Sequence, residues 1–174
     1  MQALLWDVDG TLAETERDGH RVAFNRAFED AGVPWHWDDA RYAELLRVTG
    51  GRERLLHDMA SQADAPQGSV EREQLARRLH ERKNAVYAQL LHDQGIALRE
   101  GVRDLMDEAV AHGARLAIVT TTSRSNVDAL LRVHFGVAWS SRFASVVCGE
   151  EVAAKKPAPD AFVLALEQLA LAPE

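Results

Sequence analysis

The sequence contains one cysteine, Cys148, among its 174 residues. A single cysteine excludes an intramolecular disulfide and a zinc site built from several thiolates. No run of about 18 consecutive apolar residues is present, so we expect no membrane-spanning helix. The first ten residues, MQALLWDVDG, have neither a basic segment nor a small-residue cleavage site, so we expect no secretory signal. These absences predict a cytoplasmic protein.

The sequence also has fewer basic than acidic residues. The chain has 20 lysines and arginines against 27 aspartates and glutamates, which gives a formal net charge of −7 at pH 7. A surface of that sign repels phosphate backbones, so we expect no nucleic-acid partner. It also repels phosphorylated metabolites, unless a metal ion or a local group of basic side chains gathers them. The apolar share of 47% suits one globular domain, with or without an insertion.

Short apolar runs alternate with helical patterns in most of the chain. An uninterrupted apolar run is typical of a strand that is buried on both faces of a parallel sheet. We expect strands at residues 3–6, 115–119 and 144–149. Apolar residues at helical spacing predict helices at about 101–112, 125–134 and 159–170. This alternation predicts an α/β fold with a Rossmann-like parallel sheet.

The segment from residue 15 to residue 95 has a different character. Apolar residues recur there at helical spacing, and no strand-like run occurs. Glycine and proline at residues 32–34, 49–51 and 62–69 divide it into roughly four helices. We therefore predict a split core, residues 1–14 and 96–174, with a helical insertion at 15–95.

Two aspartates follow the first predicted strand, in the run Asp7-Val8-Asp9-Gly10-Thr11. Residues two apart in an extended segment point to the same side, so Asp7 and Asp9 can face one site. Their carboxylates repel each other unless one is protonated or a divalent cation lies between them. The pair suits a nucleophile at Asp7 and a general acid and base at Asp9. A solvated turn is the plainer alternative; an EF-hand calcium loop is not, because Thr11 and Leu12 occupy positions that need other residues.

Two further polar residues follow later strands. Thr120 ends the second predicted strand and Lys156 follows the third, so both can reach the edge of the sheet where Asp7 lies. The hydroxyl of Thr120 and the backbone N–H groups at Thr120 and Thr121 suit phosphoryl oxygens. The ammonium of Lys156 suits the charge that develops around them.

These ordered motifs resemble the haloacid-dehalogenase superfamily of phosphatases and mutases. Residues 4–12, LLWDVDGTL, match its first motif; Thr120, at the end of LAIVT, matches the second; residues 156–160, KPAPD, match the third. The resemblance implies that Asp7 and Asp9 are the nucleophile and the acid/base, and that Thr120 and Lys156 bind the phosphoryl group. It also implies Mg²⁺ held by the Asp7 side chain and the Asp9 carbonyl, and a helical insertion that acts as a C1 cap.

The insertion supplies candidate substrate-binding residues. The glycine-hinged turn TGGRER carries two arginines and resembles the specificity loop of such caps, and a later lysine resembles the cap lysine of relatives. Two polar residues just after the first motif can face the same cleft. The predicted substrate-binding residues of the insertion are Glu16, His20, Arg52, Arg54 and Lys83.

The runs ETERDGHR, TGGRER and VTTTS are similar to one subgroup, the phosphatases encoded with Calvin-cycle genes. That resemblance implies a small phosphorylated sugar as substrate, with xylulose 1,5-bisphosphate as the first choice. A sugar phosphomutase of the β-phosphoglucomutase type, a phosphoglycolate phosphatase and a non-catalytic phosphosugar-binding fragment are the alternatives.

The family's fourth motif, an acidic pair after a further strand, has no counterpart after Asp160. We therefore expect a chain cut before that strand, an exposed edge on the first strand, and self-association through it. Mg²⁺ loses a carboxylate ligand in such a chain, so we predict that it is inactive or weakly active. Turnover beside a version extended through the next two strands tests this prediction, and equal rates would contradict it.

Overall fold

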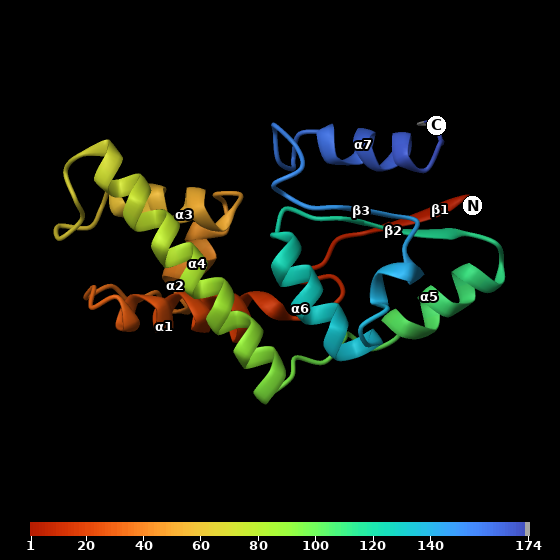
Figure 1. The fold of residues 1–174 in the computed structure, drawn as a ribbon, viewed down its shortest axis with the longest axis horizontal. Coiled ribbons are helices and arrows are strands. Elements are labelled where there is room, and N and C mark those ends of the chain that lie inside the picture. The colour runs from red at the N-terminus through yellow and green to blue at the C-terminus, as the bar shows by residue number, and fades with distance from the viewer. Residues whose placement is uncertain (173–174) are drawn as a thin grey trace. The chain divides into compact units, whose positions relative to one another are not determined.

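The protein is described by a computed structural model that covers residues 1–172 and contains two compact units. One unit combines Met1–Glu14 with residues 95–172, and the other is Thr15–Gln94. Each unit has its own secondary structure (Figure 1). In the part of the chain that the structure describes, no helix is both long and apolar enough to cross a membrane.

The first unit is built on a parallel sheet of β1 (Ala3–Trp6), β2 (Arg115–Val119) and β3 (Ser145–Val147). The strands lie in the order β1-β2-β3, and β2 is hydrogen-bonded to both neighbours. In the register of the sheet, Trp6 lies opposite Ile118 and Val119 lies opposite Val147. The carboxyl ends of all three strands therefore meet at one edge, as the sequence predicts for a parallel α/β core.

Helices cover both faces of this sheet. Figure 1 shows α5 (Val102–Ala111) and α6 (Arg124–Phe135) on one face and α7 (Asp160–Gln168) on the other. A short 3₁₀ helix, η2 (Trp139–Arg142), follows α6. The small side chains of Ala161 and Ala165 bring α7 close to Val119 and Val147 in the core. Burial on both faces explains why the strands read as continuous apolar runs.

The third strand is shorter than the sequence predicts. The apolar run at 144–149 predicts six strand residues, whereas β3 spans only Ser145–Val147. Ala144 N still donates to Leu116 O at 2.8 Å, so the strand begins close to its expected position. The chain then leaves the sheet at Cys148, and the N–H of Gly149 donates to Thr122 O instead of to a strand.

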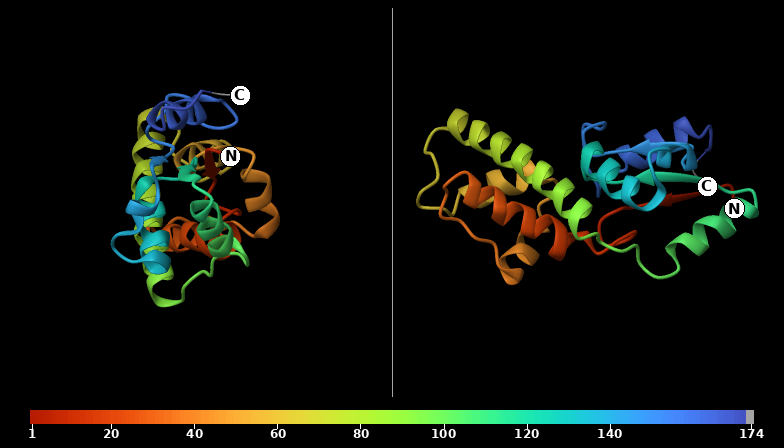
Figure 2. Two further views of the ribbon diagram at one scale, coloured as in Figure 1. Left: turned by 90° about the vertical axis from the view of Figure 1, so that its right-hand side faces the viewer. Right: turned by 60° about the horizontal axis from the view of Figure 1, so that its bottom comes forward.

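The second unit is helical throughout. A π-helical segment, η1 (Glu16–Arg21), leads into α1 (Val22–Asp30), and then come α2 (Asp39–Leu45), α3 (Gly51–Met59) and α4 (Ser69–Asp93). The long helix α4 packs against α1 and α3, and Figure 2 shows α1 running beside it. Isolated π-helical turns are uncommon and often mark functional segments.

Aromatic rings fill the core of the helical unit. Trp37 is fully buried between Phe24 and Phe28, with ring centroids 4.7 and 5.0 Å away. Such pairs add about 0.5–1.5 kcal/mol to the stabilisation from burial alone. The ring centroid of Trp35 lies 5.8 Å from that of Phe28, so both tryptophans pack inside the insertion. The unit thus has a hydrophobic core of its own.

A buried carboxylate ties the helices of this unit together. Asp58, 1% exposed, accepts hydrogen bonds from Trp37 Nε1 at 2.8 Å and from Gln62 Nε2 at 2.9 Å. The guanidinium of Arg41 donates to the same carboxylate from Nε and Nη2, and this partner raises the pKa of Arg41. Because a buried charge is tolerated only when it is paired and hydrogen-bonded, the network fixes α2 relative to α3.

Candidate functional site

Asp7 is the first residue beyond β1, at the carboxyl edge of the sheet. Its Oδ1 accepts the N–H of Val8 at 2.8 Å, which fixes the orientation of the carboxylate. Its Oδ2 lies 2.8 Å from Nζ of Lys156, and the Asp7 side chain is 41% exposed. The carboxylate is therefore both held in place and open to a ligand.

Lys156 connects Asp7 with the end of the second strand. Its ammonium donates to the carbonyl oxygen of Val119, the last residue of β2, at 3.0 Å. A lysine ammonium has three protons, and these two contacts engage two of them. Lys156 therefore joins two strand ends and keeps a donor for a bound anion.

Thr120 directly follows β2 and is 1% exposed. Its N–H donates to Val147 O at 3.0 Å, so it continues the pairing of β2 with β3. Its Oγ1 accepts the N–H of Thr122 at 3.3 Å. Thr121 lies in the same loop, half-buried, with its carbonyl against Gly149. Thr120 therefore directly follows Val119, whose carbonyl Lys156 contacts, and Thr121 comes one residue later.

Asp9 lies in the turn that carries the chain away from β1. It pairs with Ala13 in an isolated bridge, and Gly10 between them adopts φ +72°, a left-handed conformation that glycine reaches without strain. The turn is anchored by Arg99, whose Nη1 donates to Gly10 O at 2.8 Å and to Glu14 Oε1 at 2.5 Å. Nothing in the sequence pointed to Arg99, because its partners lie far away along the chain.

The described residues contain no group of three or more His, Cys, Asp or Glu side chains that could hold a metal ion. A cation at the carboxyl edge of the sheet could draw on the two acidic residues of the first motif, Asp7 and Asp9. Mg²⁺ commonly binds one or two protein carboxylates and completes its octahedron with waters and substrate phosphate oxygens. The donor set fits such a partial Mg²⁺ site.

Two of the predicted substrate-binding residues share one tyrosine in the helical unit. Tyr42 donates its hydroxyl to Glu16 Oε2 at 2.7 Å and accepts a hydrogen bond from Arg54 Nη1 at 2.9 Å. Arg54 is buried, and it also donates to the carbonyls of Leu45 and Val48 at 3.0 and 3.4 Å. Both charged residues are substrate-binding candidates predicted from the sequence, but the tyrosine between them is not.

The remaining three candidates fall into different surroundings. His20 stacks on Tyr87 with ring centroids 4.2 Å apart, and the Lys83 ammonium lies 5.2 Å from the same ring; both side chains are buried. Arg52 is 45% exposed and pairs with Glu73 at 3.6 Å. The structure thus groups His20 with Lys83 and leaves Arg52 at the surface. Contact of any of them with substrate stays a prediction.

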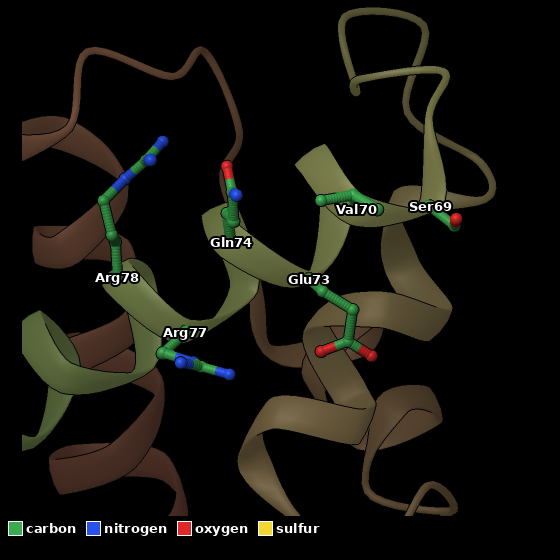
Figure 3. Close-up of a pocket in the computed structure, with 6 residues that line it drawn as sticks. All are labelled: Ser69, Val70, Glu73, Gln74, Arg77 and Arg78. Carbon is green, nitrogen blue, oxygen red and sulfur yellow. The ribbon is translucent and has the colours of Figure 1, made fainter.

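An open hollow on the helical unit follows the first half of α4 (Figure 3). Its lining includes side chains of both charges and the apolar Val70, and Arg77 and Arg78 point in different directions along the helix. It is lined by Ser69, Val70, Glu73, Gln74, Arg77 and Arg78. None of the predicted site residues lines it, so we do not assign the chemistry to this hollow.

Comparison with known proteins decides the family. A family model described as haloacid dehalogenase-like hydrolase matches residues 1–174. The chain belongs to this family.

Several members are similar over nearly the whole chain. Protein CbbY of Cupriavidus necator, of plasmid origin, is 43% identical over 98% of this chain and 67% of its own length. Protein CbbY of Cereibacter sphaeroides is 44% identical over 100% of this chain and 73% of its own length. A crystal structure of a CbbY mutant from Rhodobacter sphaeroides, in complex with xylulose-(1,5)bisphosphate, superimposes with a TM-score of 0.90. That structure is 42% identical and is matched over 98% of this chain and 73% of its own chain.

The family and fold predictions are confirmed by these matches. The chain has an α/β fold and belongs to the haloacid dehalogenase-like hydrolase family, its relatives include the CbbY group, and a phosphatase is the activity class that they support. At the carboxyl edge of the sheet, the structure brings Asp7 and Lys156 into contact and places Thr120 beside Val119, the second anchor of Lys156.

Cys148 lies beside this site but is chemically protected. It is fully buried, and burial, with smaller effects of the Glu150 and Glu151 charges, raises the pKa of its thiol to about 12. Because the thiolate is the reactive form, the folded protein should not react with a thiol reagent at pH 8. We predict negligible labelling by an aromatic disulfide reagent in buffer and one equivalent in denaturant. The variant Ser140→Cys, at an exposed position, provides the reference rate; equal rates for both cysteines would contradict this prediction.

Proposed function

We propose that this phosphatase is Mg²⁺-dependent and hydrolyses a small sugar bisphosphate, such as xylulose 1,5-bisphosphate, through an aspartyl-phosphate on Asp7. The observation that carries the proposal is the 2.8 Å pair of Asp7 and Lys156 at the carboxyl edge of the sheet, next to Thr120. The bisphosphate is suggested by the ligand of the similar CbbY structure from Rhodobacter sphaeroides.

The first step is a transfer of the phosphoryl group to the protein. An oxygen of the Asp7 carboxylate attacks phosphorus, the bond to the sugar oxygen breaks, and Asp9 donates a proton to the leaving alcohol. Lys156 and the loop at Thr120 offset the charge on the phosphoryl oxygens. The Asp7 carboxylate and the Asp9 backbone carbonyl would hold Mg²⁺, which would supply further neutralisation of that charge.

The second step regenerates the carboxylate. Asp9, now deprotonated, takes a proton from water, and the oxygen of that water attacks the phosphorus of the aspartyl-phosphate. The bond to the Asp7 oxygen breaks, and inorganic phosphate leaves. One carboxyl group therefore acts as acid in the first step and as base in the second.

The net charge of −7 repels a phosphorylated substrate, and local basic side chains offset this repulsion. Lys156 meets the first phosphate in the sheet unit. In the helical unit, Thr15–Gln94, which we propose serves as the cap, the buried ammonium of Lys83 and the separate surface guanidinium of Arg52 are the candidate cations for the second phosphate. We propose that Glu16, which accepts a hydrogen bond from Tyr42, and His20, which lies against Tyr87, bind the sugar hydroxyls.

Release of inorganic phosphate from xylulose 1,5-bisphosphate tests the proposal. The assay uses single-turnover conditions, with enzyme in excess, on this chain and on a version extended through the next two strands. Asp7→Asn removes the nucleophile, so turnover should fall by several orders of magnitude. Asp104→Asn, an exposed acid of α5, is the matched control and should leave the rate unchanged. EDTA should abolish activity and added Mg²⁺ should restore it.

Three other results would contradict the proposed function. Persistent turnover in Asp7→Asn would refute the aspartyl-phosphate route. A requirement for a bisphosphate activator, with no net release of phosphate, would assign the chain to the mutases. Binding without either reaction in the extended version would assign the protein to the non-catalytic alternative.

We also propose self-association through β1. In the sheet of the described residues, β1 pairs with β2 alone, and Ala3, Leu4 and Leu5 are only partly buried. Apolar edge strands pair readily with other chains. Light scattering should show a mass that rises with concentration, and Leu4→Lys should suppress that rise. A monodisperse monomer at every concentration would contradict the proposal.

A further inference from the structure

The loop after β3 packs directly against the loop after β2, and two contacts hold them together. Gly149 N donates to Thr122 O at 3.0 Å. The carboxylate of Glu150 accepts the N–H of Arg124, the first residue of α6, at 2.7 Å. The threonine loop of the site is therefore supported by residues that lie outside the recognised motifs.

Gly149 is required here for steric reasons. A Cβ atom at this position would lie 2.2 Å from Thr121 O and 2.8 Å from Thr121 C. These are backbone atoms, which cannot rotate away as the end of a side chain can. Gly149 is absent from the residues with positive φ, so its backbone conformation is open to any residue. The close approach to Thr121 is thus what excludes a larger side chain.

Glu150 adds an electrostatic contact at the start of α6. The first N–H groups of a helix have no partner within the helix, and that end carries a partial positive charge. A carboxylate that accepts one of these N–H groups satisfies both requirements. The neighbouring Glu151 closes the supporting loop on itself, because its Oε2 accepts the N–H of Cys148 at 2.6 Å.

The supported loop carries the predicted phosphoryl contacts. Thr122 is held from both sides, since its N–H donates to Thr120 Oγ1 at 3.3 Å and its hydroxyl oxygen accepts from Asn126 Nδ2 at 3.2 Å. A shift of Thr121 or Thr122 would therefore move the hydroxyl of Thr120 and the N–H groups around it.

We propose that Gly149 and Glu150 are positioning residues, which set the geometry of the loop Thr120–Thr122 for the phosphoryl group. This inference rests on the phosphoryl-binding role given to that loop under the proposed function. Neither residue touches the reacting atoms in this account; each acts through the backbone of the loop.

Titration of the ¹⁵N-labelled full chain with inorganic phosphate tests the inference. In the wild-type chain, phosphate should shift the amide signals of Thr121 and Thr122. Gly149→Ala should move these signals in the free protein and weaken phosphate binding roughly tenfold, because a displacement on the order of 1 Å is costly at such a site. Ala153→Ser, which adds one heavy atom to an exposed position nearby, should bind phosphate like the wild type.

Variants of Glu150 provide an independent measurement on an exposed residue. Glu150→Ala should weaken phosphate binding several-fold, and Glu150→Gln should restore it in large part, because the amide oxygen still accepts the N–H of Arg124. Glu108→Ala, an exposed glutamate of α5, is the matched control. A purely structural role would lower the stability of these variants without changing phosphate affinity at temperatures where all are folded.

The outcomes separate the two claims. If phosphate leaves the amide signals of the wild-type loop unchanged, the phosphoryl-binding role is refuted, and this inference with it. If the wild type responds and both Gly149→Ala and Glu150→Ala respond with equal affinity, the positioning role alone is refuted. Should Gly149→Ala fail to fold, the comparison of Glu150→Ala with Glu150→Gln decides.

Discussion

The ammonium of Lys156 holds the carboxylate of Asp7 at one end of a parallel sheet, with 2.8 Å between the two charged atoms. The site can exist only because parallel strands deliver their carboxyl ends to a common edge. Asp7 follows β1, Thr120 follows β2, and Lys156 returns from beyond β3 to reach Val119 O. Each strand thus contributes one element of a charge arrangement that suits a phosphoryl group.

The helical unit differs from the sheet unit in that its small core contains buried charged side chains. Arg54 and Asp58 are both almost fully buried, and each has several hydrogen-bond partners. Tyr42 links Arg54 to Glu16, and Trp37 links Asp58 to the aromatic cluster. Polar groups satisfied in this way give a small core a defined arrangement, which an apolar core specifies less strictly.

Much of the fold and the centre of the site could be predicted from the sequence. Asp7 and Lys156 stand next to apolar runs that read clearly as strands, so their convergence follows from the topology of a parallel sheet. The burial of Arg54 is harder to predict, because a glycine-rich turn with two arginines does not indicate which of the two is buried. Its burial depends on Tyr42, which lies 12 residues earlier in the sequence on α2, and on carbonyl groups that no motif records.

Gly149 shows a second limit of prediction. A glycine after a strand ordinarily suggests a turn with positive φ, whereas this one is needed because the Thr121 carbonyl approaches it. Such a packing requirement arises from two loops that are distant in sequence, and no local pattern encodes it. The premature end of β3 has the same origin, since the N–H of Gly149 is used by the loop at Thr122.

The anchor of Lys156 on a main-chain oxygen has a consequence for variation among related sequences. Because Val119 contributes its carbonyl group, any apolar residue that fits this core position leaves the anchor intact. Such substitutions in the strand therefore leave the orientation of Lys156 unchanged. A side-chain acceptor at this position would instead have to be conserved whenever the lysine is conserved.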